Sequence, residues 1–175
     1  MTNESKLPLF PILLVAAILL IGGAFFTMGG IVYTGSTIPA GLYLREDKPL
    51  AIGKLVTFCP PDLPVFHEAK QNGLVGGGSC PNGFECLMLT VAAKRKDVVT
   101  INEDGVKVND RVLANSKPLI KDKEGRVMRT FMLDHYELKE NEVLLTSDSG
   151  NDPFDGRYFG VIDVAQVDSV IKPLF

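Results

Sequence analysis

Positive charge is scarce in this 175-residue chain, in which 18 lysines and arginines are set against 21 aspartates and glutamates, for a net charge of −3 at pH 7. A surface that binds nucleic acid needs clustered lysine and arginine to neutralise phosphates. The one short basic run, residues 94–96, is followed directly by Asp97, which is typical of a solvated turn. The composition therefore predicts that nucleic acid is not a partner. Internal repeats and low-complexity segments are also absent.

Charge is missing altogether from residues 7–32. Within this stretch, residues 9–28 form an apolar run of the length, about 20 residues, that a helix needs to cross a hydrocarbon core. A cleaved signal peptide is the alternative, but its apolar region usually spans about 7–15 residues and ends in an A-x-A-like pattern that is lacking here. The sequence therefore predicts an uncleaved anchor in a lipid bilayer.

The anchor divides the chain into two parts, a tail with its membrane segment (1–32) and a single domain (33–175). The positive-inside signal is limited to Lys6 and the terminal amine, set against Glu4. With so short a leading tail, the simplest topology keeps residues 1–6 in the cytoplasm and exports the domain. We therefore expect a single-pass protein of the inner (cytoplasmic) membrane with its domain in the periplasm.

Helical periodicity is nearly absent beyond residue 33, where we expect only one helix, at residues 64–71. Short apolar and β-branched runs bounded by turn residues predict strands instead, and Asp104-Gly105 is a hairpin signal. The exported part is thus predicted to be a mainly β, antiparallel domain on a single N-terminal transmembrane helix. The expected strands are 54–58, 87–93, 98–102, 106–108, 142–146 and 167–171.

Cysteine is also sparse, with three in the chain. Cys59 and Cys80 each precede a proline and bracket a glycine-rich stretch, and a disulfide between them would suit an oxidising compartment. Closing a loop of this length contributes about 3 kcal/mol in the chain-entropy model. Cys86 would then remain as a thiol. The alternative is a zinc site formed by the three cysteines and His67, but the usual C-x₂₋₄-C pair is absent, so we expect no metal.

A serine stands just past the predicted membrane exit, in the stretch Thr34-Gly35-Ser36. A serine among glycine, threonine and proline is usually a turn residue. Its position changes that interpretation, because Ser36 could meet a substrate that is itself a membrane segment.

Four stretches together resemble the signal-peptidase group of serine proteases and, within it, the conjugative-transfer peptidases of the TraF type. They occur in the family's order and span nearly the whole exported part, and the last is the most specific. They are a nucleophile box (Gly35-Ser36-Thr37-Ile38-Pro39 with Gly41-Leu42-Tyr43), a cysteine-flanked insertion (Phe58-Cys59-Pro60-Pro61 and Cys80-Pro81-x-Gly83), a hairpin (Asp104-Gly105-Val106-x-Val108-Asn109) and a closing box (Phe154-Asp155-Gly156-Arg157-Tyr158-Phe159-Gly160).

The resemblance implies a Ser/Lys dyad, in which a serine attacks the scissile carbonyl and a neutral, desolvated lysine takes its proton. Ser36 matches the nucleophile, and Thr34 matches the hydroxyl that would stabilise the oxyanion together with the Ser36 N–H. Asp155 and Arg157 match a pair that organises the active-site loops, although an ordinary structural ion pair is an equal alternative. Asp148 fills the family's earlier aspartate position. This chemistry requires no cofactor.

The lysine of the dyad is missing from its expected place. The family's lysine stands eight residues before the aspartate that corresponds to Asp97 and is followed by arginine, but this chain has Leu89 and Thr90 there. Leucine cannot accept a proton. Lys94 is the nearest lysine, yet its odd offset of five residues points to the opposite face of a strand. The general base is therefore not identified, with Lys94 as the runner-up.

Three other basic residues are expected to lie outside the chemistry. Lys54 stands where the strand before the insertion begins and is given no catalytic role, and both histidines, His67 and His135, are expected in surface or insertion positions.

The resemblance implies a serine endopeptidase that matures an exported precursor, a conjugative pilin subunit, and some relatives join the new ends into a cyclic product. The expected partners are the membrane-embedded precursor and components of a type IV secretion system. The alternative is a catalytically impaired member that binds the precursor or the secretion machinery without cleaving it.

Overall fold

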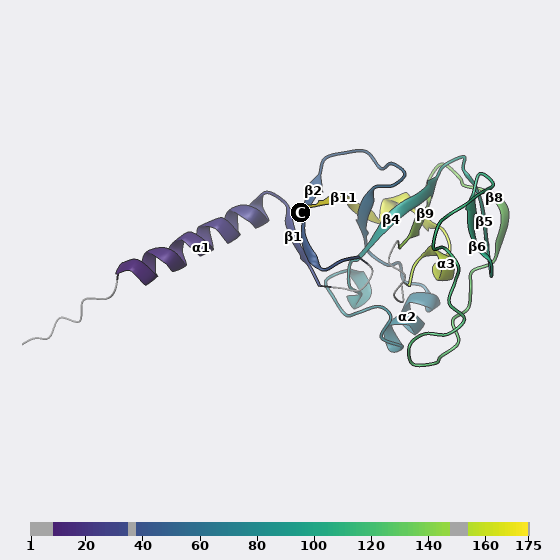
Figure 1. The fold of residues 1–175 in the computed structure, drawn as a ribbon, viewed down its shortest axis with the longest axis horizontal. Coiled ribbons are helices and arrows are strands. Elements are labelled where there is room, and N and C mark those ends of the chain that lie inside the picture. Colours follow the sequence, from purple (N-terminus) through teal and green to yellow (C-terminus); the bar gives the residue numbers. More distant parts are fainter. Residues whose placement is uncertain (1–8, 35–37, 148–153, 175) are drawn as a thin grey trace, which may run out of the picture.

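The computed structural model describes residues 9–34, 38–147 and 154–174, in which an N-terminal helix leads into a β-rich domain (Figure 1). The elements in chain order are α1 (Leu9–Thr27), β1 (Gly30–Tyr33), β2 (Gly41–Glu46), β3 (Leu55–Phe58), α2 (Pro64–Gln71), η1 (Pro81–Gly83), β4 (Leu87–Lys94), β5 (Val98–Asn102), β6 (Gly105–Val108), β7 (Arg111–Val112), β8 (Leu133–Glu137), β9 (Glu142–Thr146), α3 (Gly156–Phe159), β10 (Ile162–Asp163), η2 (Val164–Gln166) and β11 (Val167–Pro173).

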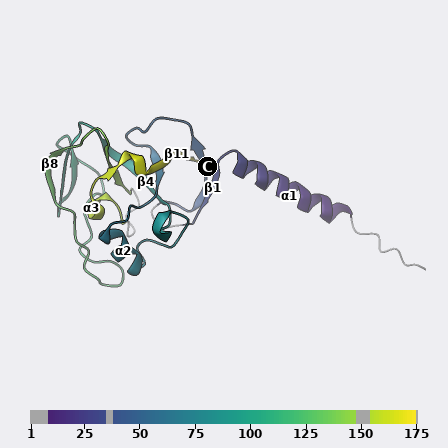
Figure 2. The same ribbon diagram turned by 180° about the vertical axis from the view of Figure 1, so that it is seen from behind.

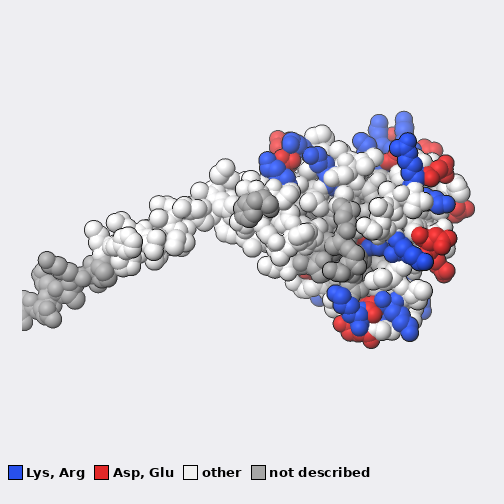
Figure 3. Space-filling model, viewed as in Figure 1, with Lys and Arg blue, Asp and Glu red and all other residues white. Residues whose placement is uncertain are grey.

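Helix α1 has the length and composition of a membrane-spanning segment. It has 19 residues with a mean hydropathy of 2.7, and none of its residues is buried within the protein. Figure 3 shows its surface without charged side chains, whereas lysine, arginine, aspartate and glutamate gather on the domain. The helix lies almost exactly where the sequence predicts an anchor, since the expected span is 9–28.

Two antiparallel sheets form the domain, which confirms the predicted mainly β fold (Figures 1 and 2). The larger sheet has the strand order β1-β2-β11-β3-β4-β9-β10, and the smaller has the order β7-β6-β5-β8. Strand β11, near the end of the chain, lies between β2 and β3, so the chain ends close to the start of the domain. Figure 1 shows the C-terminus beside β1 and the end of α1.

The predicted elements are found with small changes of boundary. The helix is present at Pro64–Gln71, where Pro64 occupies the first turn and needs no N–H partner there. The Asp-Gly signal is confirmed by the pairing of Asn102 with Gly105 across β5 and β6. Gly105 has φ +137° and a Cβ there would lie 2.8 Å from the Ser116 Oγ, so the turn requires glycine.

The main core lies under the larger sheet and is rich in phenylalanine. Phe66 of α2 lies at its centre, with its ring 5.1 Å from Phe159 and 5.8 Å from Phe154, centroid to centroid. Both of those residues belong to the closing box. Helix α2 therefore attaches the cysteine-flanked segment to the closing box through packed rings, which favour such tilted and edge-to-face contacts.

Candidate active site

The nucleophile box lies on the hairpin of β1 and β2. Tyr33 pairs with Gly41 across the two strands, so residues 34–40 form the connection. Thr34 follows β1 directly and is exposed, as an oxyanion donor facing substrate would have to be. Ser36 lies outside the described residues, but the chain on both sides of it is described.

The residues after Ser36 are fixed by packing and by one hydrogen bond. Ile38 is buried, with 7% of its surface exposed, in a cluster with Tyr33, Tyr43 and Met88. The Tyr43 hydroxyl donates a hydrogen bond of 2.6 Å to the carbonyl oxygen of Pro39. The proline ring also fixes its own φ. The connection that carries Ser36 is therefore anchored from its C-terminal side.

Strand β4 carries the position at which the family resemblance implies a lysine. Leu89 pairs with Val56 of β3 and has 0% of its surface exposed, in the main apolar core. Met88 belongs instead to the cluster around Ile38, because successive residues of a strand point to opposite faces. The side chain at position 89 thus has a water-excluded apolar environment of the kind that keeps an amine neutral.

The other candidate bases lie elsewhere. Lys94 is exposed at the far end of β4, five residues or about 16 Å along the strand from Leu89. Lys54 contributes its backbone carbonyl, which accepts a hydrogen bond of 2.9 Å from the Val91 N–H. His67 and His135 are both exposed, on α2 and β8 respectively.

Asp155 and Arg157 form a buried ion pair in the closing box, with 0% and 3% of their surfaces exposed. The guanidinium donates two hydrogen bonds, from Nε to Oδ1 at 2.8 Å and from Nη2 to Oδ2 at 2.9 Å. The backbone N–H groups of Ser147 and Arg157 also donate to the same carboxylate, at 2.7 and 3.0 Å. Both carboxylate oxygens of Asp155 are thus occupied by N–H donors.

The same pair connects three segments. Ser147 directly follows β9, Asp155 caps the first turn of α3, and Arg157 Nη1 donates to the Lys117 carbonyl oxygen at 3.2 Å. Burial works to lower the pKa of Arg157, but the hydrogen bonds and charge of Asp155 outweigh it and raise that pKa. Arg157 therefore remains charged, and the pair fixes β9, α3 and the 117–119 segment together. Asp148 lies outside the described residues.

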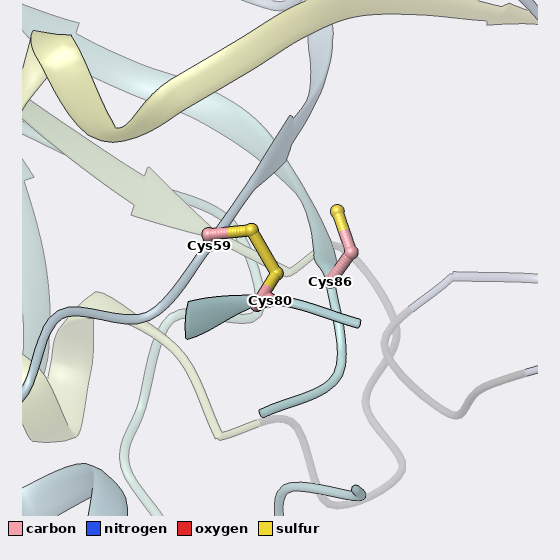
Figure 4. Close-up of side chains that lie close together, drawn as sticks. All are labelled: Cys59, Cys80 and Cys86. Atoms are coloured by element: carbon pink, nitrogen blue, oxygen red, sulfur yellow. A yellow bond between two sulfur atoms is a disulfide. The ribbon is translucent and has the colours of Figure 1, made fainter. Parts of the chain in front are cut away.

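The cysteines are paired as the sequence predicts. Cys59 and Cys80 form a disulfide with their Cα atoms 5.5 Å apart, and Cys86 is a free thiol. Figure 4 shows the Cys86 sulfur close to this disulfide, and the three sulfur atoms lie within 4.8 Å of one another. His67, which the alternative zinc site would have used as a ligand, packs its ring against Phe84 and contacts Asp62.

Sequence reasoning did not find several residues that build this site. The Tyr43–Pro39 hydrogen bond and the Ser147 contact with Asp155 depend on tertiary structure, although Tyr43 stands in a motif that the resemblance singles out. The position of Cys86 next to the disulfide also follows from the strand register and not from a sequence signal. The register that pairs Phe58 with Leu87 places Cys59 and Cys86 one step further on, in neighbouring chain segments.

Comparison with known proteins decides the family. The model of the family described as signal peptidase, peptidase S26, matches residues 7–174. This chain belongs to that family. Its members are serine peptidases, so the fold and the coarse chemistry expected from the four motifs are confirmed. A solved signal peptidase I from Enterococcus faecalis aligns with 70% of this chain and 97% of its own, at 17% identity and a TM-score of 0.40.

Conjugation proteins are among the relatives of this S26 family member. A plasmid transfer protein TraF of Escherichia coli is 42% identical over 160 residues, which is 91% of this chain and 89% of that protein. A second plasmid transfer protein TraF of Escherichia coli is 40% identical over 158 residues, or 90% and 89% of the two chains. The conjugal transfer protein TraF of Agrobacterium tumefaciens is 33% identical over 139 residues, or 78% and 77%.

Proposed function

We propose that this chain is a membrane-anchored serine endopeptidase that matures an exported precursor, a conjugative pilin subunit. The observation that carries the proposal is the family match across residues 7–174, together with relatives named for plasmid transfer that align over about nine-tenths of the chain. The apolar helix α1 supports an anchor in the inner membrane with residues 33–175 in the periplasm. There the domain would meet a membrane-embedded precursor and components of a type IV secretion system.

Ser36 is the proposed nucleophile, with Thr34 and the Ser36 N–H stabilising the oxyanion. Its hydroxyl adds to the scissile carbonyl while its proton passes to a base. The C–N bond then breaks, the amine leaves with that proton, and water hydrolyses the acyl-enzyme ester to release the new carboxylate and restore Ser36. The Tyr43–Pro39 hydrogen bond and the buried Ile38 support this assignment, because a nucleophile must be held in place. The buried pair of Asp155 and Arg157 organises the neighbouring segments.

The test is co-expression with the pilin precursor of the same transfer system, followed by mass spectrometry of the mature product. Ser36→Ala should remove processing while leaving the fold intact, since a loop hydroxyl contributes little to stability. The matched control is Ser79→Ala, which removes an exposed hydroxyl from the glycine-rich stretch and should leave processing unchanged. Continued processing by Ser36→Ala would end the serine-peptidase proposal.

The fully buried Leu89 favours a second candidate function, that of a family member which binds the precursor or the secretion machinery without cleaving it. With leucine there, no amine is present at that position to take the proton from Ser36. This candidate predicts that uncleaved precursor co-purifies with the wild-type protein as efficiently as with Ser36→Ala. An active peptidase would retain precursor only in the Ser36→Ala variant.

A further inference from the structure

The sulfur atoms of Cys59, Cys80 and Cys86 lie close together just beyond the last residue pair of β3 and β4 (Figure 4). Cys59 and Cys80 are bonded to each other, and Cys86 is a free thiol. We propose that the Cys86 thiol exchanges with the Cys59–Cys80 disulfide in the folded protein. The product is a Cys59–Cys86 disulfide with a free thiol at Cys80. This inference concerns the three cysteines and does not depend on peptidase activity.

The strand register selects Cys59 as the sulfur that is attacked. The last pair of the β3–β4 ladder is Phe58 with Leu87. Continuing the antiparallel register by one residue places Cys59, after β3, opposite Cys86, before β4. Directly opposed residues of antiparallel strands have Cα atoms about 4.5–5.5 Å apart. Disulfides span Cα separations of about 4.4–6.8 Å. A bond between these two cysteines therefore needs little movement of the backbone.

The leaving cysteine stays in place after the bond breaks. The Cys80 N–H donates to the Phe84 carbonyl oxygen at 3.0 Å, and the Gly83 N–H donates to the Cys80 carbonyl oxygen at 3.0 Å. Lys70 of α2 donates from Nζ to the Gly83 carbonyl oxygen at 2.6 Å. These contacts fix the short turn without help from the disulfide, so Cys80 remains near the other two sulfurs and the reaction is reversible.

The step is balanced within the chain. The Cys86 thiolate gives an electron pair to the Cys59 sulfur, the bond between Cys59 and Cys80 breaks, and its electron pair leaves on the Cys80 sulfur. The proton lost by Cys86 is replaced by one taken up at Cys80. One disulfide and one thiol are present before and after, so neither an oxidant nor a reductant is needed.

The surroundings of Cys86 make the exchange slow at neutral pH. Burial raises the pKa of the Cys86 thiol, and the charge of Asp168 raises it further, as does Glu85 to a smaller extent. A hydrogen bond with Thr57 and the charge of Arg45 act in the lowering direction, but they do not overcome the rise. Because the thiolate is the attacking species, exchange should accelerate as pH increases.

The exchange would alter the support of the closing box. In the Cys59–Cys80 isomer, the segment that contains α2 is closed by a covalent bond, and its Phe66 packs on Phe154 and Phe159. In the Cys59–Cys86 isomer α2 still lies in a covalently closed loop, but the closure is six residues later, and the turn at Cys80 is held by its hydrogen bonds alone. The exchange therefore loosens the covalent tie next to α2 without opening the loop.

The first test maps the disulfide in the full-length oxidised protein in detergent, after incubation at pH 6 or pH 9 without denaturant, acid quenching and alkylation with N-ethylmaleimide. At pH 6 the label should be found on Cys86. At pH 9 it should also be found on Cys80, together with a linked Cys59–Cys86 peptide. Label confined to Cys86 at both values of pH would overturn the proposal, and a Cys80–Cys86 link would overturn the choice of Cys59.

The second test uses variants under oxidising conditions. Cys80→Ser should form the Cys59–Cys86 bridge, whereas the matched Cys59→Ser should keep both thiols free. Asp168→Asn should speed exchange in the intact three-cysteine protein at pH 7.5 by roughly two- to fivefold, because more thiolate is present. Asp134→Asn, at an exposed site on β8, is its control. Equal rates in the two aspartate variants would mean exchange through unfolding and would overturn the proposal, as would two free thiols in Cys80→Ser.

Discussion

The hydroxyl of Tyr43 lies 2.6 Å from the carbonyl oxygen of Pro39 and donates a hydrogen bond to it. Burial raises the pKa of Tyr43, and the nearby Tyr33 raises it further, so the donor stays protonated at neutral pH. The bond connects β2 to the chain three residues after Ser36. Tyr43 is therefore placed to hold the nucleophile box in one position.

Tyr43→Phe should slow precursor processing with little loss of stability. Removing the hydroxyl costs about 1 kcal/mol of unfolding free energy. Turnover should fall by about tenfold, because a small displacement of the nucleophile is expensive. The measurements are the rate of precursor conversion and a denaturant curve. Tyr136→Phe is the control. Tyr136 belongs to the smaller sheet, and the change removes a 3.0 Å hydrogen bond from its hydroxyl to Glu142. Equal turnover in the two variants would exclude the positioning role.

Leu89→Lys should raise turnover if the chain is an impaired peptidase. General-base assistance is worth about 10²–10⁴ in rate, and the buried apolar site should keep the new amine neutral. The gain should disappear when Ser36→Ala is added. Stability should rise with pH, because the unfolded chain holds a proton on this lysine that the folded chain does not.

Two control variants test whether the amine and its position on β4 are both required. Leu89→Met keeps the volume without an amine, and Met88→Lys puts an amine on the face of β4 that packs against Ile38. The family resemblance predicts activation of Leu89→Lys alone, whereas activation of Met88→Lys alone would show that the face packed against Ile38 is the one that serves Ser36. Efficient turnover by the wild type, with no gain in Leu89→Lys, would mean that another base exists and would make Lys94 the next residue to replace.

Asp155→Asn should destabilise the domain strongly. Arg157 has 3% of its surface exposed and would lose its charged partner, which costs about 3–5 kcal/mol for a buried pair. The midpoint of chemical denaturation reports the loss. Glu140→Gln breaks the exposed pair of Arg95 and Glu140 and should change the midpoint little. A small loss in both variants would contradict the organising role of Asp155.

A reporter fused after residue 175 should be active only outside the cytoplasm. Helix α1 is the reason, since its 19 residues, with a mean hydropathy of 2.7, match the thickness of a hydrocarbon core. Alkaline phosphatase should therefore be active in the fusion, whereas a fluorescent protein that folds only in the cytoplasm should be dark. Deleting residues 9–27 should reverse both readings. Fluorescence from the intact fusion would refute the topology.

Local signals in the sequence were enough to predict much of the fold. Pro64 at the start of α2 and Asp104-Gly105 between β5 and β6 act through backbone preferences of neighbouring residues, and both elements are found. The disulfide was also predictable, since Cys59 and Cys80 bracket one stretch. Such features depend on residues close together in the chain, so their residue types can be read from the sequence.

Features that depend on distant contacts were not predictable. The hairpin of β1 and β2 has no strong strand pattern of its own and is completed by β11, more than a hundred residues later in the chain. Helix α3 has four residues, too few for a periodic pattern, and owes its start to the Asp155 side chain. Leu89 likewise faces the main core because of the way β4 pairs with β3, and no local signal specifies that pairing.

The central place of β11 also sets an order of events during biogenesis. Among the strands that the structure describes, β11 makes the ladder that joins the hairpin carrying Ser36 to the rest of the larger sheet, with β2 on one side of β11 and β3 on the other. A chain emerging from its N-terminus must therefore complete synthesis and translocation of nearly every residue before this hairpin can dock. Such long-range closure is slow. The proposed nucleophile is consequently assembled last, and a half-made chain carries Ser36 without the sheet that would hold it.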